Sequence, residues 1–361
     1  MKLHAPGMQT LWLSADAVLD SRNAGMADLA AGVPVTDLTT FNAYSVTKTF
    51  TAAAVLQLAE QGRLDLDRPI ARYLDRFPYA DSPTVRQTLT HTGGLPNPIP
   101  LSWVHLADEH EAFDSAQFID AVLRANPRLK SEPGRRVAYS NLGYLLLGQL
   151  IEQLSGQPYA DFVEQHLIRP LQLRDGETLA FTIPQAKLHA QGHVERWSLL
   201  NLVLGFFIDR ERFIAARSGR WLQLRPLYVN GAAYGGLIGN ARGFARYLQA
   251  LLGQGDYLSP HLRAQLLTVA HAPDGSALGR SLGWFAGTLR GLPYFAHAGG
   301  GPGFYCEIRL YPRAGRASVV MLNRSGIRDE RLLDRIDCAS IEGGDWLARG
   351  AGSRALSADP S

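Results

Sequence analysis

The chain has 361 residues, of which 46% are hydrophobic and 19% charged, with a formal net charge of +3 at pH 7. This length can bury a sizeable core, and the mild charge, without a run of like charges, gives no sign of a nucleic-acid-binding arm. No stretch reaches the roughly 18 consecutive apolar residues of a membrane helix, and the N-terminus lacks the basic and then apolar regions of a signal peptide. We therefore expect a cytoplasmic protein, whose oligomeric state stays open.

The pattern of apolar residues predicts strands at both ends of the chain and helices between them. Over the first forty residues, short apolar runs alternate with Asp, Asn and Gly, which is typical of strands and turns. From residue 45 to 61, apolar residues four apart, from Val46 to Leu58, fall on one helical face, and Gly62 closes the segment. An α/β fold with a helical region inserted in the middle follows. Further helices are expected at 140–155, at 158–169 (ended by Pro170) and at 242–253, and strands at 282–290, 294–300, 304–312 and 317–323.

The first motif that carries chemistry is Ser45-Val46-Thr47-Lys48. A spacing of three places Ser45 and Lys48 on one face of a helical turn, within hydrogen-bonding reach. Serine becomes a nucleophile when a base takes its proton, and a lysine serves if burial and neighbouring positive charge lower its pKa. Lysine occurs at four positions against 32 for arginine, which cannot be deprotonated in a protein. Alone, the spacing more often means a serine cap and a solvated lysine, but the run after Lys48 is mostly apolar.

The second motif, Tyr139-Ser140-Asn141, opens the apolar helix expected at 140–155. A tyrosine hydroxyl acts as a general base when a nearby cation depresses its pKa, and Lys48 is a candidate cation. Asn141 is a candidate donor to the surroundings of Lys48 or to a substrate carbonyl. The alternative is a helix N-cap at Ser140 or Asn141 with a merely packed tyrosine.

The third motif is a glycine-rich run, residues 297–303, at the end of a predicted strand. Glycines allow a backbone to approach a ligand closely, and a backbone N–H there, paired with that of Ser45, would form an oxyanion hole. His297 would add a polar group beside it. The alternative is a glycine-rich hairpin turn, and no Gly-Lys-Ser/Thr follows to make a phosphate-binding loop.

Other features give no sign of a metal, a cofactor or a disulfide. His189 and His193 are four apart, but no glutamate follows His189 as a zinc protease requires. Cys306 and Cys338 have neither a disulfide framework nor metal-ligand spacing and are expected to be free thiols. The Arg-rich residues 210–225 are interpreted as a solvated face.

Taken together in this order, the motifs resemble the serine beta-lactamase and penicillin-binding-protein superfamily. The class C branch, with its esterase and D-aminopeptidase relatives, is more similar because it has Tyr-x-Asn second and Lys- or His-x-Gly third. The similarity runs over most of the chain, and the composite of motifs is highly specific. It is carried by residues 41–74, 88–96, 137–152, 235–252 and 297–304.

The resemblance implies roles and an architecture. Ser45 would be the nucleophile, Lys48 its proton partner, and Tyr139 the base that activates Ser45 and then the deacylating water. Asn141 and His297 would contact substrate, and Gly299 and Gly300 would border an oxyanion hole formed by the N–H groups of Ser45 and Gly300. The implied fold is α/β of the α+β type, an antiparallel sheet flanked by helices with an inserted all-helical region. One catalytic unit would span 1–345, with its α/β part at about 1–60 and 230–340, its helical part at about 61–229, and a flexible tail at 346–361.

Two departures shape the expected function. His297 stands where beta-lactamases carry lysine, and a neutral histidine is not a fixed cation for a beta-lactam carboxylate. Residues 196–228 are unusually apolar, and residues 197–208 are expected either in the core or as a wall or lid of the acyl site. We therefore expect a carboxylesterase for short to medium acyl esters, with a small-molecule ester or amide as its partner. A beta-lactamase, a D-amino-acid peptidase, an acyl transferase and a catalytically silent binding protein remain alternatives.

Overall fold

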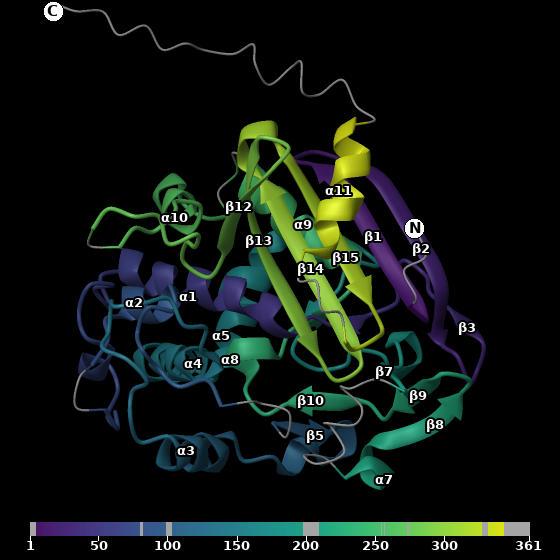
Figure 1. Ribbon diagram of the computed structural model, residues 1–361, viewed down its shortest axis with the longest axis horizontal. Coiled ribbons are helices and arrows are strands. Elements are labelled where there is room, and N and C mark those ends of the chain that lie inside the picture. Colours follow the sequence, from purple (N-terminus) through teal and green to yellow (C-terminus); the bar gives the residue numbers. More distant parts are fainter. Residues whose placement is uncertain are drawn as a thin grey trace, which may run out of the picture.

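The computed structural model describes residues 5–79, 82–98, 103–197, 209–253, 255, 257–272, 274–326 and 331–342, so the apolar run at 198–208 and the tail at 346–361 lie outside it. Its centre is a seven-stranded sheet in the order β12-β13-β14-β15-β1-β2-β3, in which every neighbouring pair is antiparallel. The predicted antiparallel sheet is confirmed (Figure 1). The strands are β1 (Gly7–Ser14), β2 (Val18–Asp28), β3 (Val33–Pro34), β12 (Phe285–Leu289), β13 (Leu292–Gly301), β14 (Phe304–Tyr311) and β15 (Arg316–Leu322).

The sheet joins the two ends of the described chain. β1 lies between β2 and β15, with Met8 opposite Leu322, and the Gly7 N–H donates to Asn323 Oδ1 at 2.6 Å. Nearly all of β1 is buried, because helices cover both faces of the sheet at this strand. Side chains alternate between the faces of a strand, so neighbouring residues of β1 contact different helices.

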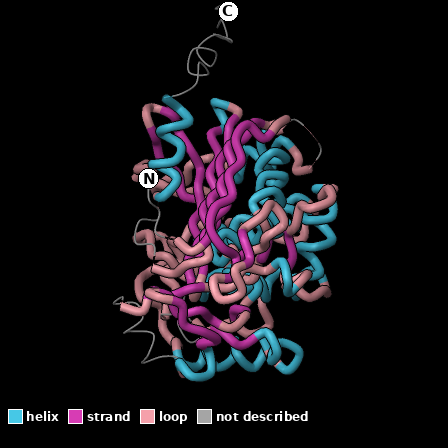
Figure 2. The backbone as a smooth tube through the Cα atoms, turned by 90° about the vertical axis from the view of Figure 1, so that its right-hand side faces the viewer, coloured by secondary structure: helices cyan, strands magenta, loops and turns pink. Residues whose placement is uncertain are grey.

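Helices lie on both sides of the sheet (Figures 1 and 2), and at β1 one face packs against α9 and the other against α11. On one face, Gln9 of β1 accepts the Ala241 N–H at the start of α9 (Ala241–Leu252) through its side-chain oxygen at 2.8 Å. On the other face, Trp12 packs with Ile341 of α11 (Leu332–Glu342). The sequence pattern predicted α9 but not α11.

Helix α1 (Thr47–Glu60) is the centre of the helical side of the molecule. Its residues from Thr47 to Leu56 are all buried, so the helix is enclosed on every side, rather than having the single apolar face that the sequence predicted. It packs against α4 (Asn141–Ser155), α8 (Ala232–Gly235) and α10 (Pro260–Leu266). A helix that is surrounded in this way lets a polar side chain such as Lys48 be buried completely.

The helix predicted at 158–169 has a more complex form. α5 (Tyr159–Val163) continues as a π turn (Glu164–Ile168) and then as a 3-10 turn (Arg169–Leu171) that contains Pro170. Proline fits the start of a helical turn because no N–H is needed there, so the run passes the proline that was expected to end it.

The described part of the chain has no helix long and apolar enough to cross a membrane. The remaining elements are β4 (Phe41–Asn42), η1 (Tyr44–Val46), η2 (Ile70–Arg72), α2 (Val85–Leu89), β5 (Val104–Leu106), η4 (Ala107–Ala112), α3 (Ser115–Ala125), β6 (Leu179–Ala180), η7 (Ala186–Leu188), β7 (His193–Glu195), α7 (Arg210–Phe213), β8 (Ile214–Ser218), β9 (Trp221–Leu224), β10 (Leu227–Val229), β11 (Ile238–Gly239) and η8 (Pro312–Ala314).

Candidate active site

Ser45 lies in the tight turn η1, directly before α1. Tyr44 precedes it with φ +47°, a left-handed conformation that non-glycine residues adopt only when their surroundings enforce it. Here the Tyr44 hydroxyl donates to the Pro302 carbonyl at 2.5 Å, and the Thr47 hydroxyl donates to the Tyr44 carbonyl at 2.6 Å. The turn thus holds Ser45 half-exposed between buried neighbours.

Lys48 is fully buried and has neutral hydrogen-bond partners. Its ammonium donates to Ser45 Oγ at 3.0 Å and to Asn141 Oδ1 at 2.8 Å. A third hydrogen bond goes to the Tyr234 carbonyl at 2.7 Å. Within the described ranges, no carboxylate pairs with Lys48, and burial lowers its pKa well below the usual value of 10.5. Lys48 is therefore placed to exchange a proton with Ser45.

Tyr139 reaches the same serine from the mouth of α4. Its hydroxyl lies 2.9 Å from Ser45 Oγ, and the Lys48 ammonium lies 5.0 Å from the centre of its ring. The following residue, Ser140, caps α4 by accepting the Gly143 N–H at 3.0 Å. Ser140 is therefore the helix N-cap that the alternative interpretation expected. Tyr139 nevertheless lies beside Ser45 and Lys48.

Asn141 is oriented by a second amide. The Asn97 side-chain oxygen accepts from Asn141 Nδ2 at 3.2 Å and from the Asn141 backbone N–H at 3.0 Å. With its amide nitrogen engaged in this way, Asn141 presents its oxygen to Lys48. Asn97 was not among the residues predicted from the sequence.

His297 is a buried, neutral member of the site. It is 1% exposed, and its Nδ1 lies 2.8 Å from the Ala298 carbonyl. Burial, and to a lesser extent the charge of Lys48, lower the pKa of His297 to about 3. The ring is therefore uncharged at neutral pH and supplies no cation at the position where beta-lactamases carry lysine.

The two glycines after His297 differ in their surroundings. A Cβ on Gly299 would lie 2.0 Å from the Ala43 carbonyl oxygen and 2.7 Å from the Ser45 nitrogen, so only glycine fits against the nucleophile turn. Gly300 is exposed, and a Cβ there would meet only the Tyr305 ring at 3.7 Å. No acceptor within the described residues takes the Ser45 N–H. The exposed backbone at Gly300 and the N–H of Ser45 thus remain the predicted oxyanion hole.

The edge of β13 is open beside these glycines. β12 pairs with β13 only from Leu292 to Ala296, so from His297 onward no described strand occupies that edge. A groove of about 550 Å³ borders the two strands, and its lining includes His297 and Phe285 together with Tyr294 and Arg309 from the side of the sheet that α11 covers. Ser45, Lys48 and Tyr139 do not line it. An extended substrate backbone would find unpaired backbone groups along this edge.

Besides Asn97, four contributors to the site lie outside the predicted set. The Tyr234 carbonyl anchors Lys48, and Phe285 packs edge-on against the His297 ring at 5.1 Å. The Arg280 guanidinium stacks over Phe285 at 4.3 Å, and its charge contributes to the low pKa of His91 and His297. His91 belongs to the segment 88–96, which resembles the family's sequence, but no role was predicted for it. No local pattern marks the other three, because distant chain segments bring them together.

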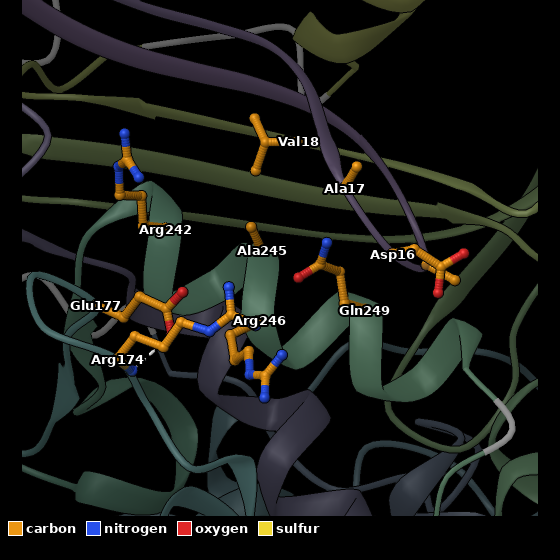
Figure 3. Close-up of a pocket in the computed structure, with 10 residues that line it drawn as sticks. Asp16, Ala17, Val18, Arg174, Glu177, Arg242, Ala245, Arg246 and Gln249 are labelled. Atoms are coloured by element: carbon orange, nitrogen blue, oxygen red, sulfur yellow. Dashed lines mark hydrogen bonds between the residues drawn. The ribbon is translucent and has the colours of Figure 1, made fainter.

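A second hollow, of about 400 Å³, lies between the β1–β2 turn and α9 (Figure 3). Arg174, Arg242 and Arg246 line it together with Glu177, and Arg242 pairs with Asp37. None of the predicted catalytic residues lines this hollow, so it is not a candidate for the active site.

Known proteins with similar sequences include penicillin-binding proteins and a protein called flp. Penicillin-binding protein 4* of Bacillus subtilis is 25% identical over 85% of this chain and 66% of its own length. Protein flp of Staphylococcus aureus is 29% identical over 48% of the chain and 35% of its own length. Penicillin-binding protein 4 of Amycolatopsis lactamdurans is 27% identical over 89% of the chain and 81% of its own length. The chain thus spans about two thirds of the length of the Bacillus subtilis protein and about a third of the length of protein flp.

Solved structures show the same fold. The octameric penicillin-binding protein homologue from Pyrococcus abyssi superposes with a TM-score of 0.74 at 22% identity, covering 95% of this chain and 75% of its own. The D-amino acid amidase from Ochrobactrum anthropi SV3 superposes with a TM-score of 0.75 at 20% identity, covering 94% and 95%. The family model "Beta-lactamase" matches residues 1–339. The chain therefore belongs to the beta-lactamase family and has its serine hydrolase fold.

Proposed function

We propose that the protein is a serine hydrolase that forms an acyl-enzyme through Ser45, and that its substrates are esters with short to medium acyl chains. One observation carries this proposal. Ser45 Oγ lies 3.0 Å from Lys48 Nζ and 2.9 Å from the Tyr139 hydroxyl, and the buried lysine has neutral partners.

The reaction follows from these contacts. Lys48 or Tyr139 must enter the reaction without its proton, and burial favours the neutral amine of Lys48. This base takes the Ser45 proton while Oγ bonds to the substrate carbonyl carbon, and the N–H groups of Ser45 and Gly300 stabilise the oxyanion. The C–O bond to the leaving alcohol then breaks, and the alcohol departs with that proton. Water then attacks the acyl carbon while Tyr139 takes its proton and passes its own, through Ser45 Oγ or directly, to the neutral amine of Lys48. When the bond from the acyl carbon to Ser45 Oγ breaks, the acid leaves and this proton returns to Ser45 Oγ.

The neutral His297 supports an ester over a beta-lactam. A beta-lactam presents a carboxylate, and a buried, uncharged imidazole is a poor partner for it. The test is an activity screen on p-nitrophenyl esters from acetate to decanoate, with nitrocefin alongside. We expect ester turnover that rises with chain length until the acyl pocket is full, and little nitrocefin turnover. Efficient nitrocefin hydrolysis with negligible ester hydrolysis would overturn the ester assignment.

A second candidate, an amidase or peptidase for D-amino acids, has support from a separate observation. The open edge of β13 suits the backbone of an amide substrate. The similar fold of the D-amino acid amidase agrees with this candidate. D-phenylalanine amide and D-phenylalanine p-nitroanilide, each beside its L-enantiomer, provide the test. D-selective hydrolysis faster than that of any ester would favour this candidate.

Both candidates need a reactive serine, which a silent binding protein lacks. A fluorophosphonate probe should label the wild type at one site and should not label Ser45→Ala. Absence of labelling in the folded wild type would refute the acyl-enzyme and favour the binding protein.

A further inference from the structure

His91 follows the short helix α2 and contacts Tyr139 through both its backbone and its ring. Its carbonyl oxygen accepts the Ala138 N–H at 2.7 Å, and its Nδ1 accepts the Ser140 N–H at 3.1 Å. These two amides flank Tyr139 in the chain. The backbone on both sides of this tyrosine is therefore tied to one histidine.

The rings of the two residues also pack together. The centres of the His91 and Tyr139 rings are 4.4 Å apart and the planes are inclined by 34°. Farther away, Phe285 stacks on Tyr139 at 6.4 Å and 21°. The Tyr139 ring thus has aromatic contacts that restrict its rotation, in addition to the two backbone hydrogen bonds.

His91 has the conformation and protonation state that these contacts require. Its φ of +58° is unusual for a residue other than glycine or asparagine. The side chain is buried, and burial, followed by the charges of Arg280 and Lys48, lowers its pKa well below 6.5. Only an unprotonated Nδ1 can accept the Ser140 N–H, so the neutral ring is the form that holds Tyr139.

We propose that His91 is a positioning residue that directs the Tyr139 hydroxyl at Ser45, a role that rests on the proposed acyl-Ser45 reaction. It acts through Tyr139 and does not itself touch the reacting atoms. A displacement of about 1 Å at such a hydroxyl is enough to cost about 100-fold in rate. The role therefore concerns the rate of acylation more than the binding of substrate.

Two substitutions separate the contacts of His91. His91→Phe keeps a ring against Tyr139 but removes the acceptor for the Ser140 N–H. His91→Asn restores an acceptor close to the position of Nδ1 and tolerates positive φ. We expect the rate constant for fluorophosphonate labelling to fall about 10- to 100-fold in His91→Phe and to recover most of this loss in His91→Asn. KM for an ester should change less than kcat.

A double-mutant cycle with Tyr139→Phe distinguishes positioning from a general loss of structure. If His91 acts through the tyrosine hydroxyl, adding His91→Phe to Tyr139→Phe should cost less than about twofold more. Additive losses would overturn the proposal. The matched control is His189→Asn, since His189 is also buried and uses its Nδ1, toward Thr40, at 3.1 Å. This control should label at the wild-type rate.

A crystal structure of each His91 variant decides the question even if the wild type proves unreactive. The proposal requires the Tyr139 hydroxyl to leave the position 2.9 Å from Ser45 Oγ in His91→Phe and to keep it in His91→Asn. An unmoved tyrosine in His91→Phe would overturn the positioning role. An unlabelled wild type would refute the acyl-enzyme alone.

Discussion

Lys48 and Arg309 are both completely buried cations, but their surroundings are opposite. Lys48 donates to a serine hydroxyl, a side-chain amide and a backbone carbonyl, none of which carries charge. Arg309 lies on β14 beneath α11 and is paired with carboxylates of Glu307 at 2.9 Å and Asp334 at 2.7 Å, with Asp337 at 3.5 Å.

The same burial therefore has different consequences for the two charges. It lowers the pKa of Lys48, because no negative charge compensates for the loss of water. Burial alone would also lower the pKa of Arg309, but the carboxylates of Asp337 and Glu307 outweigh it and raise that pKa. A cation among neutral acceptors can exchange a proton, whereas a cation among carboxylates is a permanent structural charge.

The largest expected effect comes from replacing Lys48 by a residue whose positive charge is permanent. Lys48→Arg keeps the positive charge but cannot release a proton, so turnover and fluorophosphonate labelling should fall by about 10³-fold or more. The measurement is steady-state hydrolysis of a p-nitrophenyl ester, with Lys130→Arg as a control at an exposed lysine that has no contact with Ser45. Near-normal kcat in Lys48→Arg would show that proton exchange by Lys48 is not needed.

Tyr139→Phe removes the second contact to Ser45 and keeps the ring. The expected loss in kcat is about 10² to 10⁴, with little change in the melting temperature because the packing surface remains. Stopped-flow measurement of acylation and deacylation would show which step loses more. If activity survives intact, Tyr139 is a packing residue and the lysine works alone.

Arg309→Met tests the structural side of the comparison. Removing one partner of a buried ion pair leaves uncompensated charge and typically costs about 3–5 kcal/mol of unfolding free energy. We expect this loss in urea denaturation, while the folded fraction still labels at Ser45. A stability unchanged from wild type would mean that the three carboxylates are protonated or solvated without their arginine.

Glu307→Gln should produce the smallest effect, a change in the pH dependence of stability. Burial raises the pKa of Glu307 to about 7 in the folded protein, from a usual value of 4.5. The folded state therefore holds the proton more tightly, and this contribution to stability is present below about pH 4.5 and is lost as the pH rises through about 7.

The melting temperature should fall less steeply between pH 4.5 and about 7 in Glu307→Gln than in the wild type. Some dependence should remain, because burial also raises the pKa of Asp337 to about 6. The exposed Glu132 offers the control, since Glu132→Gln should leave the profile unchanged. Parallel profiles for Glu307→Gln and the wild type would contradict the assignment.

The difference between these regions also explains what the sequence could predict. The motifs at Ser45, Tyr139 and His297 are local, because each depends on residues within a few positions of one another. The expected sheet strands were likewise visible as apolar runs. The local motifs, together with the family resemblance that they carry, were therefore sufficient to predict the fold class and the residues that meet at Ser45.

Features formed by distant segments were not predictable in this way. Asp337 is buried on α11, where its carboxylate accepts hydrogen bonds from the hydroxyls of Tyr311 and Ser318. A carboxylate on the buried face interrupts the periodic apolar pattern by which a helix is predicted, so α11 was missed. The Tyr234 carbonyl contacts Lys48 across 186 positions, and a backbone group carries no sequence signature. His91 lies in the family-like segment 88–96, but its contact with Tyr139 depends on the turn that places it there.

Because β1 pairs with β15, the central sheet cannot form until nearly the whole chain has been synthesised. Met8 leaves the ribosome long before its partner Leu322, and at about 5–20 residues per second the interval is on the order of tens of seconds. During this time one edge of β1 has no native partner and is exposed to wrong pairing with other chains. Gly299 of β13, which packs against the Ser45 turn, is also made late. The nascent chain thus carries its serine and lysine through most of translation before the strand that completes their surroundings exists.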